Sequence, residues 1–180
     1  MWIFFNSAFK FLSLLIISNK QKMKKVLFAA VAVLTFGFAN AQEGKFKVGA
    51  NVGLPMGDIK DSYSFTIGLD AAYTWAISDK FDAGVGAGYG LYMGKEDFIE
   101  DASFVPVYGT AQYLITDSIF LGADLGYAVG IAPSENDGGL YYQPKVGFQV
   151  SEFSVYAGYK GISVEGGTFS SLNLGFNYRF

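Results

Sequence analysis

The chain has 180 residues, enough for one domain, and its formal net charge is −3. It contains neither Cys nor His, which excludes disulfides, thiolate metal sites and the usual general base near neutral pH. We therefore expect no cofactor and no metal site. Residues 42–180 carry a net charge of −8, which argues against nucleic acid as a partner.

A secretory signal peptide is predicted at residues 23–41, where two Lys precede an apolar run too short to span a bilayer comfortably. Its A-x-A motif, from Ala39 to Ala41, predicts cleavage before Gln42. Residues 1–22 are interpreted as an artefact of the assigned start or as an extension of the leader. The artefact is favoured because the signal that begins at Met23 is complete by itself, and two transmembrane helices are disfavoured because the runs are short or interrupted.

The rest of the chain alternates apolar and polar residues almost without pause, and no stretch keeps a helical period. The predicted strands cover residues 44–54, 64–77, 81–92, 103–115, 119–130, 140–150, 153–163 and 168–180. Each is long enough to cross a bilayer, which takes about 9–11 residues in a tilted strand.

One face of every predicted strand is free of Asp, Glu, Lys and Arg, as in Phe46, Val48, Ala50, Val52 and Leu54 of the first strand. The opposite face carries the charges. A register shift of one residue would place those charges in lipid, so this pattern predicts a lipid-facing exterior and a polar lumen.

The connections also predict a membrane barrel. Short turns (SDK, TDS and SE) are expected to alternate with longer polar stretches (PMGDIKDSY, GKEDFIEDA, APSENDGG and VEGG), as in barrels with periplasmic turns and external loops. Outward aromatic residues gather near both ends of the strands, where they would form two girdles. A soluble, lipocalin-like barrel is disfavoured because it would leave Gly and Ala where a core needs bulk.

These features resemble the outer-membrane protein beta-barrel domain family, the small eight-stranded barrels akin to the OmpA transmembrane domain, OmpX, opacity-type and porin-family proteins. The resemblance rests on the signal peptide, the eight alternating segments and the last ten residues, SLNLGFNYRF. It implies an all-β fold, an eight-stranded antiparallel up-and-down transmembrane β-barrel, located in the cell outer membrane and surrounded by its lipid.

The same resemblance implies that the outer-membrane barrel assembly machinery reads a C-terminal signal. Its residues are the alternate hydrophobic positions that end in an aromatic: Leu172, Leu174, Phe176, Tyr178 and Phe180. We also expect Phe180 to be held by pairing with the first strand near Phe46.

The interior of an eight-stranded barrel is narrow enough for side chains to fill it. We expect the inward charges to pair as a salt-bridged polar plug, because buried charges need partners. This predicted lumen network comprises Lys47, Asp70, Asp82, Asp124, Lys145, Lys160 and Arg179. The competing interpretation of the same groups is a narrow conductance path or a small-ligand cavity.

Two other features of the predicted lumen concern its walls. An inward row of glycines leaves space for bulky side chains from other strands, namely Gly84, Gly86, Gly88 and Gly90 against Phe104, Tyr108, Tyr141 and Tyr156. Pro106 and Pro144 lie inside predicted strands, where we expect a bulge or an unpaired position.

Because Ser–His and Asp–His arrangements are impossible without His, the chain is predicted not to be an enzyme. The favoured hypothesis is a structural or surface-interaction barrel that meets an extracellular partner through acidic loops. The alternative is a narrow porin-like channel for small solutes, and a soluble ligand carrier comes third.

Overall fold

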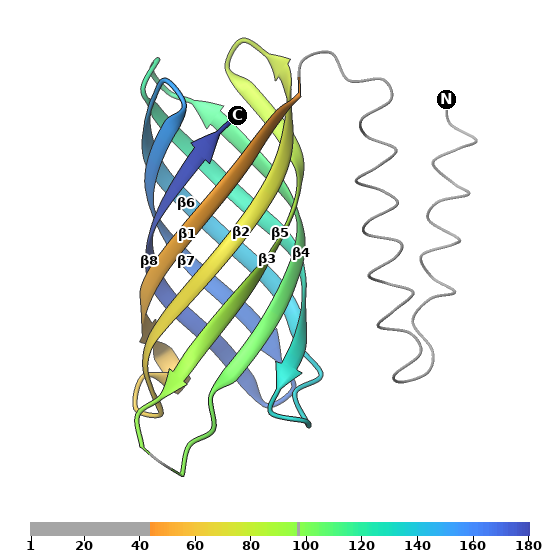
Figure 1. Ribbon diagram of the computed structural model, residues 1–180, viewed down its shortest axis with the longest axis vertical. Helices are drawn as coiled ribbons and strands as arrows, with labels where there is room; N and C mark the ends of the chain where they lie inside the picture. Colours follow the sequence, from red (N-terminus) through yellow and green to blue (C-terminus); the bar gives the residue numbers. More distant parts are fainter. Residues whose placement is uncertain (1–43, 97) are drawn as a thin grey trace, which may run out of the picture. The chain divides into compact units, whose positions relative to one another are not determined.

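The computed structural model describes residues 44–96 and 98–180, which form a closed antiparallel barrel in which successive strands are neighbours (Figure 1). The strands are β1 (Lys45–Met56), β2 (Tyr63–Ser78), β3 (Phe81–Gly94), β4 (Ala102–Leu114), β5 (Ile119–Ala132), β6 (Gly139–Val150), β7 (Phe153–Val164) and β8 (Gly167–Arg179). The predicted fold is confirmed, and every strand end lies within two residues of its predicted position. The predicted signal peptide, with its cleavage site before Gln42, and residues 1–22 lie outside the described residues.

Closure is made by β1 and β8, the first and last strands. Their ladder pairs outward residues with outward residues, as in Val52 with Leu174 and Leu54 with Leu172. It continues to the chain end, where the Phe180 N–H donates to the Phe46 carbonyl at 2.8 Å. The expected pairing of Phe180 near Phe46 is therefore confirmed, and the closed ladder leaves no sheet edge exposed.

The connections divide the barrel into two ends. The C-terminus lies with three connections at one end, here named the turn end, and four connections lie at the opposite loop end (Figure 1). Residues 57–62, 95–101 and 133–138 are longer connections, as predicted. The prediction of a longer connection at VEGG was wrong. β7 ends at Val164 and β8 begins at Gly167, so only residues 165–166 connect them. Within the described residues, no helix is long and apolar enough to cross a membrane.

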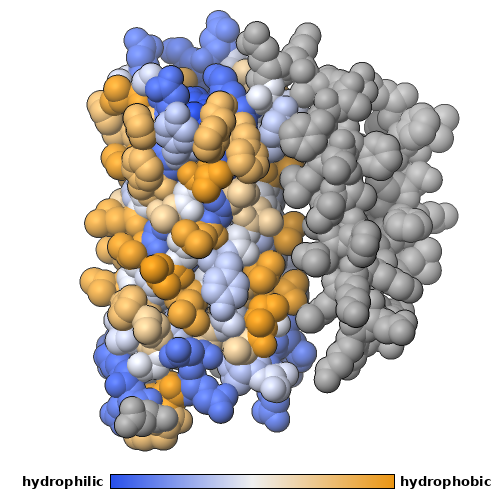
Figure 2. Space-filling view, viewed as in Figure 1, coloured by the Kyte–Doolittle hydropathy of each residue, from blue (hydrophilic) through white to orange (hydrophobic). Residues whose placement is uncertain are grey.

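The two faces of the strands differ in exposure and chemistry. Large hydrophobic side chains cover the outside of the barrel, and hydrophilic residues gather at its two ends (Figure 2). At the turn end the outward aromatics touch one another, with Phe153 5.1 Å from Tyr178 and Tyr178 4.7 Å from Phe180 between ring centroids. At the loop end the Tyr142 and Tyr159 centroids are 6.4 Å apart. These contacts belong to the two predicted girdles.

The prolines interrupt the ladders without shifting their register. The β3–β4 pairing runs to Ala87 with Val107 and resumes at Gly90 with Phe104, so Pro106 lies in the gap. The β6–β7 pairing stops at Tyr142 and resumes at Lys145, which brackets Pro144 in the same way. Proline has no N–H to donate, and each strand accommodates it by leaving positions unpaired on one side. The expected irregularity is present, as unpaired positions and not as bulges.

The lipid-facing exterior can be tested by placing a charge at two depths. Leu125 in the middle of β5 is 61% exposed, and Ile77 beside the turn end of β2 is 63% exposed. We expect Leu125→Arg to lower the free energy of unfolding by about 2–4 kcal/mol and the matched Ile77→Arg by about 0–1 kcal/mol. Urea titration of the barrel in phospholipid vesicles measures both. Equal effects would contradict a membrane-embedded middle.

Candidate functional site

The lumen is the candidate site, because the charged and polar side chains of the strands converge there. Its loop end is filled by an aromatic cluster. The Phe104 and Phe169 ring centroids lie 5.0 Å apart, and Tyr92 lies 5.8 Å from Phe104 and 5.4 Å from Phe169. Tyr63 joins them 5.5 Å from Phe169. Edge-to-face contacts of this kind favour a fixed arrangement of the rings, so this end of the lumen is packed.

The first connection closes over this cluster. After β1 the chain forms a short 3-10 turn, η1 (Gly57–Ile59), and Ile59 is buried in the same cluster as Tyr92 and Phe104. The Ser170 hydroxyl of β8 donates to the Met56 carbonyl at 2.9 Å, which fixes the start of the turn. An apolar side chain from a loop therefore completes the packing of the loop end.

Below the aromatic cluster, the glycine wall admits a tyrosine as predicted. An added Cβ at Gly86 would lie 2.6 Å from the Tyr108 ring, which is closer than real Cβ atoms come to other atoms. The ring centroids of Tyr108 and Tyr141 in turn lie 5.4 Å apart in the lumen. All four predicted filling residues are buried: Phe104, Tyr108, Tyr141 and Tyr156.

An ion pair lies across neighbouring strands near the middle of the lumen. The Lys145 ammonium donates to both Asp124 carboxylate oxygens at 2.8 and 2.7 Å, and Asp124 is 4% exposed. Lys145 Nζ also lies 5.5 Å from the centroid of the Tyr156 ring, a distance that allows a cation–π contact. Within residues 44–96 and 98–180 this is the one ion pair shorter than 4.0 Å.

A second polar group is linked through an amide. Lys160, 7% exposed, donates to Asn51 Oδ1 at 2.8 Å, and Asn51 Nδ2 lies 3.4 Å from Asp70 Oδ1. Asn51 therefore connects a buried ammonium to a carboxylate that it does not contact directly. Such a bridge gives each of the two opposite charges a hydrogen bond, although the charged groups themselves do not touch.

Toward the turn end, amides replace ion pairs. Lys47 Nζ donates to Gln112 Oε1 at 3.1 Å, and Gln112 Nε2 donates to Gln149 Oε1 at 2.7 Å. Asp82 stands directly opposite Gln112 on the β3–β4 ladder. Arg179 lies at the rim and donates to the backbone carbonyl of Ser151 at 2.7 Å.

The structure thus brings six of the seven predicted network residues into the interior and leaves Arg179 at the rim. The expected salt bridge forms between Asp124 and Lys145, whereas Lys47 and Lys160 donate hydrogen bonds to amide oxygens. Sequence reasoning missed Ile59, Tyr92 and Phe169 as parts of the plug. Tyr92 and Phe169 each lie an even number of residues from inward residues of the same strand, so alternation could have indicated that both face the lumen.

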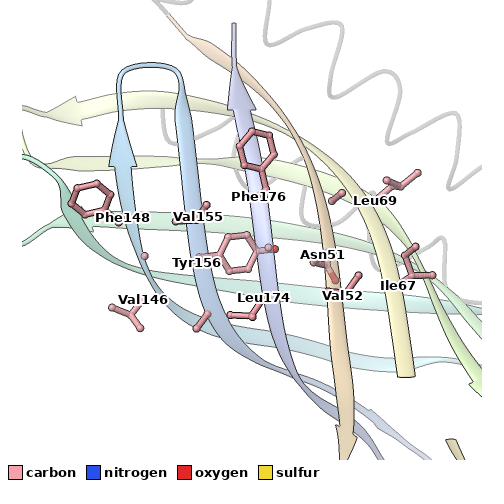
Figure 3. Close-up of a pocket in the computed structure, with 14 residues that line it drawn as sticks. Asn51, Val52, Ile67, Leu69, Val146, Phe148, Val155, Tyr156, Leu174 and Phe176 are labelled. Carbon is pink, nitrogen blue, oxygen red and sulfur yellow. The ribbon is translucent and has the colours of Figure 1, made fainter. Parts of the chain in front are cut away.

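The outer wall has a shallow groove across β1, β2, β6, β7 and β8 (Figure 3). The outward side chains that line it are apolar: Val52, Ile67, Leu69, Val146, Phe148, Val155, Leu174 and Phe176. Asn51 and Tyr156 also border it, but both are buried in the barrel. This groove is part of the hydrophobic exterior and presents no charged group for chemistry.

The closed strands, the apolar exterior and the filled polar interior define a transmembrane barrel of the outer-membrane class. No family model matches the chain, and no curated protein matches it by sequence. Solved structures of small outer-membrane barrels do match it by fold, which agrees with the predicted eight-stranded barrel.

One match is the backbone structure of the Yersinia pestis outer membrane protein Ail in a phospholipid nanodisc, with a TM-score of 0.53 and 17% identity over 77% of this chain and 100% of that one. The crystal structure of Ail, the attachment invasion locus protein of Yersinia pestis, gives 0.52 and 18% over 78% and 100%. A de novo designed transmembrane β-barrel gives 0.52 and 15% over 78% and 100%. A designed barrel and a natural one are equally similar, so these matches define fold and not activity.

The central ion pair gives a test of the lumen. Asp124→Asn leaves the Lys145 ammonium buried without its counter-charge, so we expect the free energy of unfolding to fall by about 3–5 kcal/mol. Asp82→Asn is the matched control, since Asp82 has no ion pair, and should cost at most about 1 kcal/mol. The double variant Asp124→Leu/Lys145→Met should recover most of the loss. Urea titrations that give equal losses for both Asn variants would contradict a buried pair.

Proposed function

We propose that this chain is a non-conducting, non-enzymatic outer-membrane barrel that serves as a platform for its surface connections. The observation that carries the proposal is the succession of filled layers in the lumen. The aromatic cluster of Phe104 and Phe169 fills the loop end, the Asp124–Lys145 pair lies deeper, and the Lys47–Gln112–Gln149 chain crosses toward the turn end. A solute would have to displace packed rings and a paired charge to cross.

The residue types support a non-enzymatic role. The chain has no His or Cys, and the interior Asp124 carboxylate is already engaged by both hydrogen bonds from Lys145. A carboxylate held in this way is a poor general base, because the paired ammonium favours its charged form and lowers its proton affinity. The lumen chemistry therefore favours a structural use of these groups.

The connections at the loop end are the part of the molecule that would meet a partner. They are acidic: Asp58, Asp61, Glu96, Asp97, Glu100, Asp101, Glu135, Asp137 and Glu165 stand against Lys60 and Lys95. Phe98 adds an aromatic side chain that is 80% exposed. A surface of this charge attracts a cationic protein surface, and an exposed Phe offers such a partner an apolar anchor.

Hydrogen bonds between connections hold this surface in shape. Lys95 Nζ donates to the Lys60 carbonyl at 2.7 Å, and the Lys95 N–H donates to the Ser62 carbonyl at 2.9 Å. The Tyr127 hydroxyl donates to the Asp137 carbonyl at 3.1 Å. Connections tied to one another and to the barrel lose less entropy on binding than free loops do.

Planar-bilayer recording tests the filled lumen against the alternative of a narrow porin-like channel. We expect purified, refolded protein to give no stable ohmic steps, because the packed rings and paired charges leave no continuous water path. A known porin reconstituted in parallel shows that insertion and recording work, and heat-modifiable migration on gels shows that the sample is folded. Reproducible steps from folded protein would overturn the proposal in favour of the channel.

The proposed recognition of the C-terminal residues by the assembly machinery can be separated from their packing. The Phe46 and Phe180 ring centroids lie 6.0 Å apart, so Phe46→Ala removes the same ring contact as deletion of Phe180 but keeps the terminal aromatic. We expect deletion of Phe180 to reduce the heat-modifiable, assembled fraction in cells well below that of Phe46→Ala. The deletion also removes the terminal backbone hydrogen bond and the ring contact with Tyr178, so its purified barrel should unfold at a somewhat lower urea concentration, by less than the loss of assembly. Equal assembly of the two variants would leave Phe180 a packing role alone.

A further inference from the structure

We propose that the lumen contains a binding site for one structural water molecule, in a small cavity beside Lys160 and Asp70. The cavity has a volume of about 20 Å³. Its polar lining includes Asn51, Asp70 and Lys160, and its aromatic lining includes Tyr92 and Tyr108. This inference does not depend on whether the barrel conducts or on what its connections bind.

The size of the cavity sets the class of ligand. A cavity needs roughly 10–15 Å³ of this kind of volume to hold a water molecule, so 20 Å³ is enough for one water. The charges in its wall are one ammonium and one carboxylate, which together favour a neutral molecule that can both donate and accept over an ion of either sign. Water meets both requirements.

The polar groups around the cavity have hydrogen-bonding capacity to spare. Lys160 has three N–H donors and gives one of them to Asn51. Asp70 receives its hydrogen bond from Asn51 at 3.4 Å, which is long for a charged acceptor. The Tyr92 hydroxyl is buried and has no hydrogen-bond partner of good geometry, although Ser171 lies beside it. A water here would have the two to four polar partners that buried waters have.

The interrupted ladder supplies a further partner. Gly88 and Pro106 both line the cavity, and they fall in the gap between the paired stretches of β3 and β4. Pro106 cannot donate a backbone hydrogen bond to the facing strand. Within a bilayer, every backbone group needs a partner inside the protein, and a water at this position can donate where the proline does not.

A bound water would join the two kinds of filling in the lumen. Phe104 and Ile162 of the aromatic end line the cavity together with the charged groups below them. One molecule that accepts from Lys160 and donates to Asp70 gives both charges a partner at the border with the apolar cluster. The site therefore completes the hydrogen bonding of a charged pair that no direct contact joins.

The protein in phospholipid nanodiscs allows a direct test by NMR. We expect nuclear Overhauser cross-peaks between water and the backbone amides of Gly88 and Gly90, with the sign of a water that stays bound for longer than the tumbling time. Outward-facing Leu125 should show none. Absence of these cross-peaks at Gly88 and Gly90, in a spectrum where exposed loop amides do show exchange with water, would overturn the site.

A variant pair gives an independent readout. An added Cβ at Gly90 meets no atom within 4 Å, and Gly90 lines the cavity, so Gly90→Ala places a methyl group at the cavity without a clash. If a water is displaced, buried polar groups lose their partner, and the ratio of folded to unfolded protein should fall roughly 5- to 30-fold. Gly109→Ala is the control, since Gly109 is outward and its added Cβ makes ordinary contacts at 3.8 Å and beyond.

The direction of the stability change decides between the outcomes. Without a water in the cavity the alanine methyl displaces nothing and only reduces the conformational entropy of the unfolded chain, so Gly90→Ala would then be as stable as the Gly109→Ala control or more stable. That result would overturn the proposal. A loss confined to Gly90→Ala, together with disappearance of the water cross-peak at Gly88, would support it.

Discussion

The structure depends on the requirement that every backbone N–H and C=O find a partner where no water is available. In hydrocarbon an unpaired backbone group costs several kcal/mol, and a sheet can meet that cost only by closing on itself. The ladder between β1 and β8 makes that closure, down to the hydrogen bond from Phe180 to Phe46. Without it, the other seven ladders would leave two edges in the bilayer.

Closure at eight strands also decides what the inside can be. A barrel of this size has room for side chains and little else, so inward residues must fill the lumen and satisfy one another. Aromatic rings fill the lumen at the loop end, one ion pair lies near its middle, and amides take over toward the turn end. This filling is the basis of the proposal that the connections, and not the lumen, carry the specific function.

Most of the architecture could be predicted from the sequence, since the period of two and the sorting of charges are consequences of the same bilayer constraint. Phe46, Val52 and Leu174 were placed outward from alternation alone, and all three are exposed. The length of the connection after β7 was harder to predict, because consecutive glycines are typical of a longer loop. Gly166 has a φ of +88° and lies in a tight turn, and Gly167 already belongs to β8.

The sequence predicts which side chains face the interior, but not which of them contact one another. Which inward side chains meet is set by the relative register of strands distant in sequence, which alternation does not contain. Asp124 and Lys145 lie on adjacent strands and meet, whereas Lys160 reaches Asn51 on β1, 109 residues away. The buried position of Ile59 was missed for a different reason, since it lies in a connection, where alternation does not indicate burial.

The central claim is that alternate residues of one strand face lipid and lumen in a closed barrel. The chain contains no Cys, so single cysteines along β8 at positions 171–174 and 176 can each carry a nitroxide spin label in phospholipid vesicles. Gly175 is left unlabelled, because a side chain there would meet the Tyr156 ring. Electron paramagnetic resonance then measures collisions of the label with oxygen, which concentrates in lipid. We predict high oxygen accessibility at 172, 174 and 176 and low accessibility at 171 and 173. Accessibility without this period of two, or water-soluble relaxants reaching the outward positions, would contradict the account.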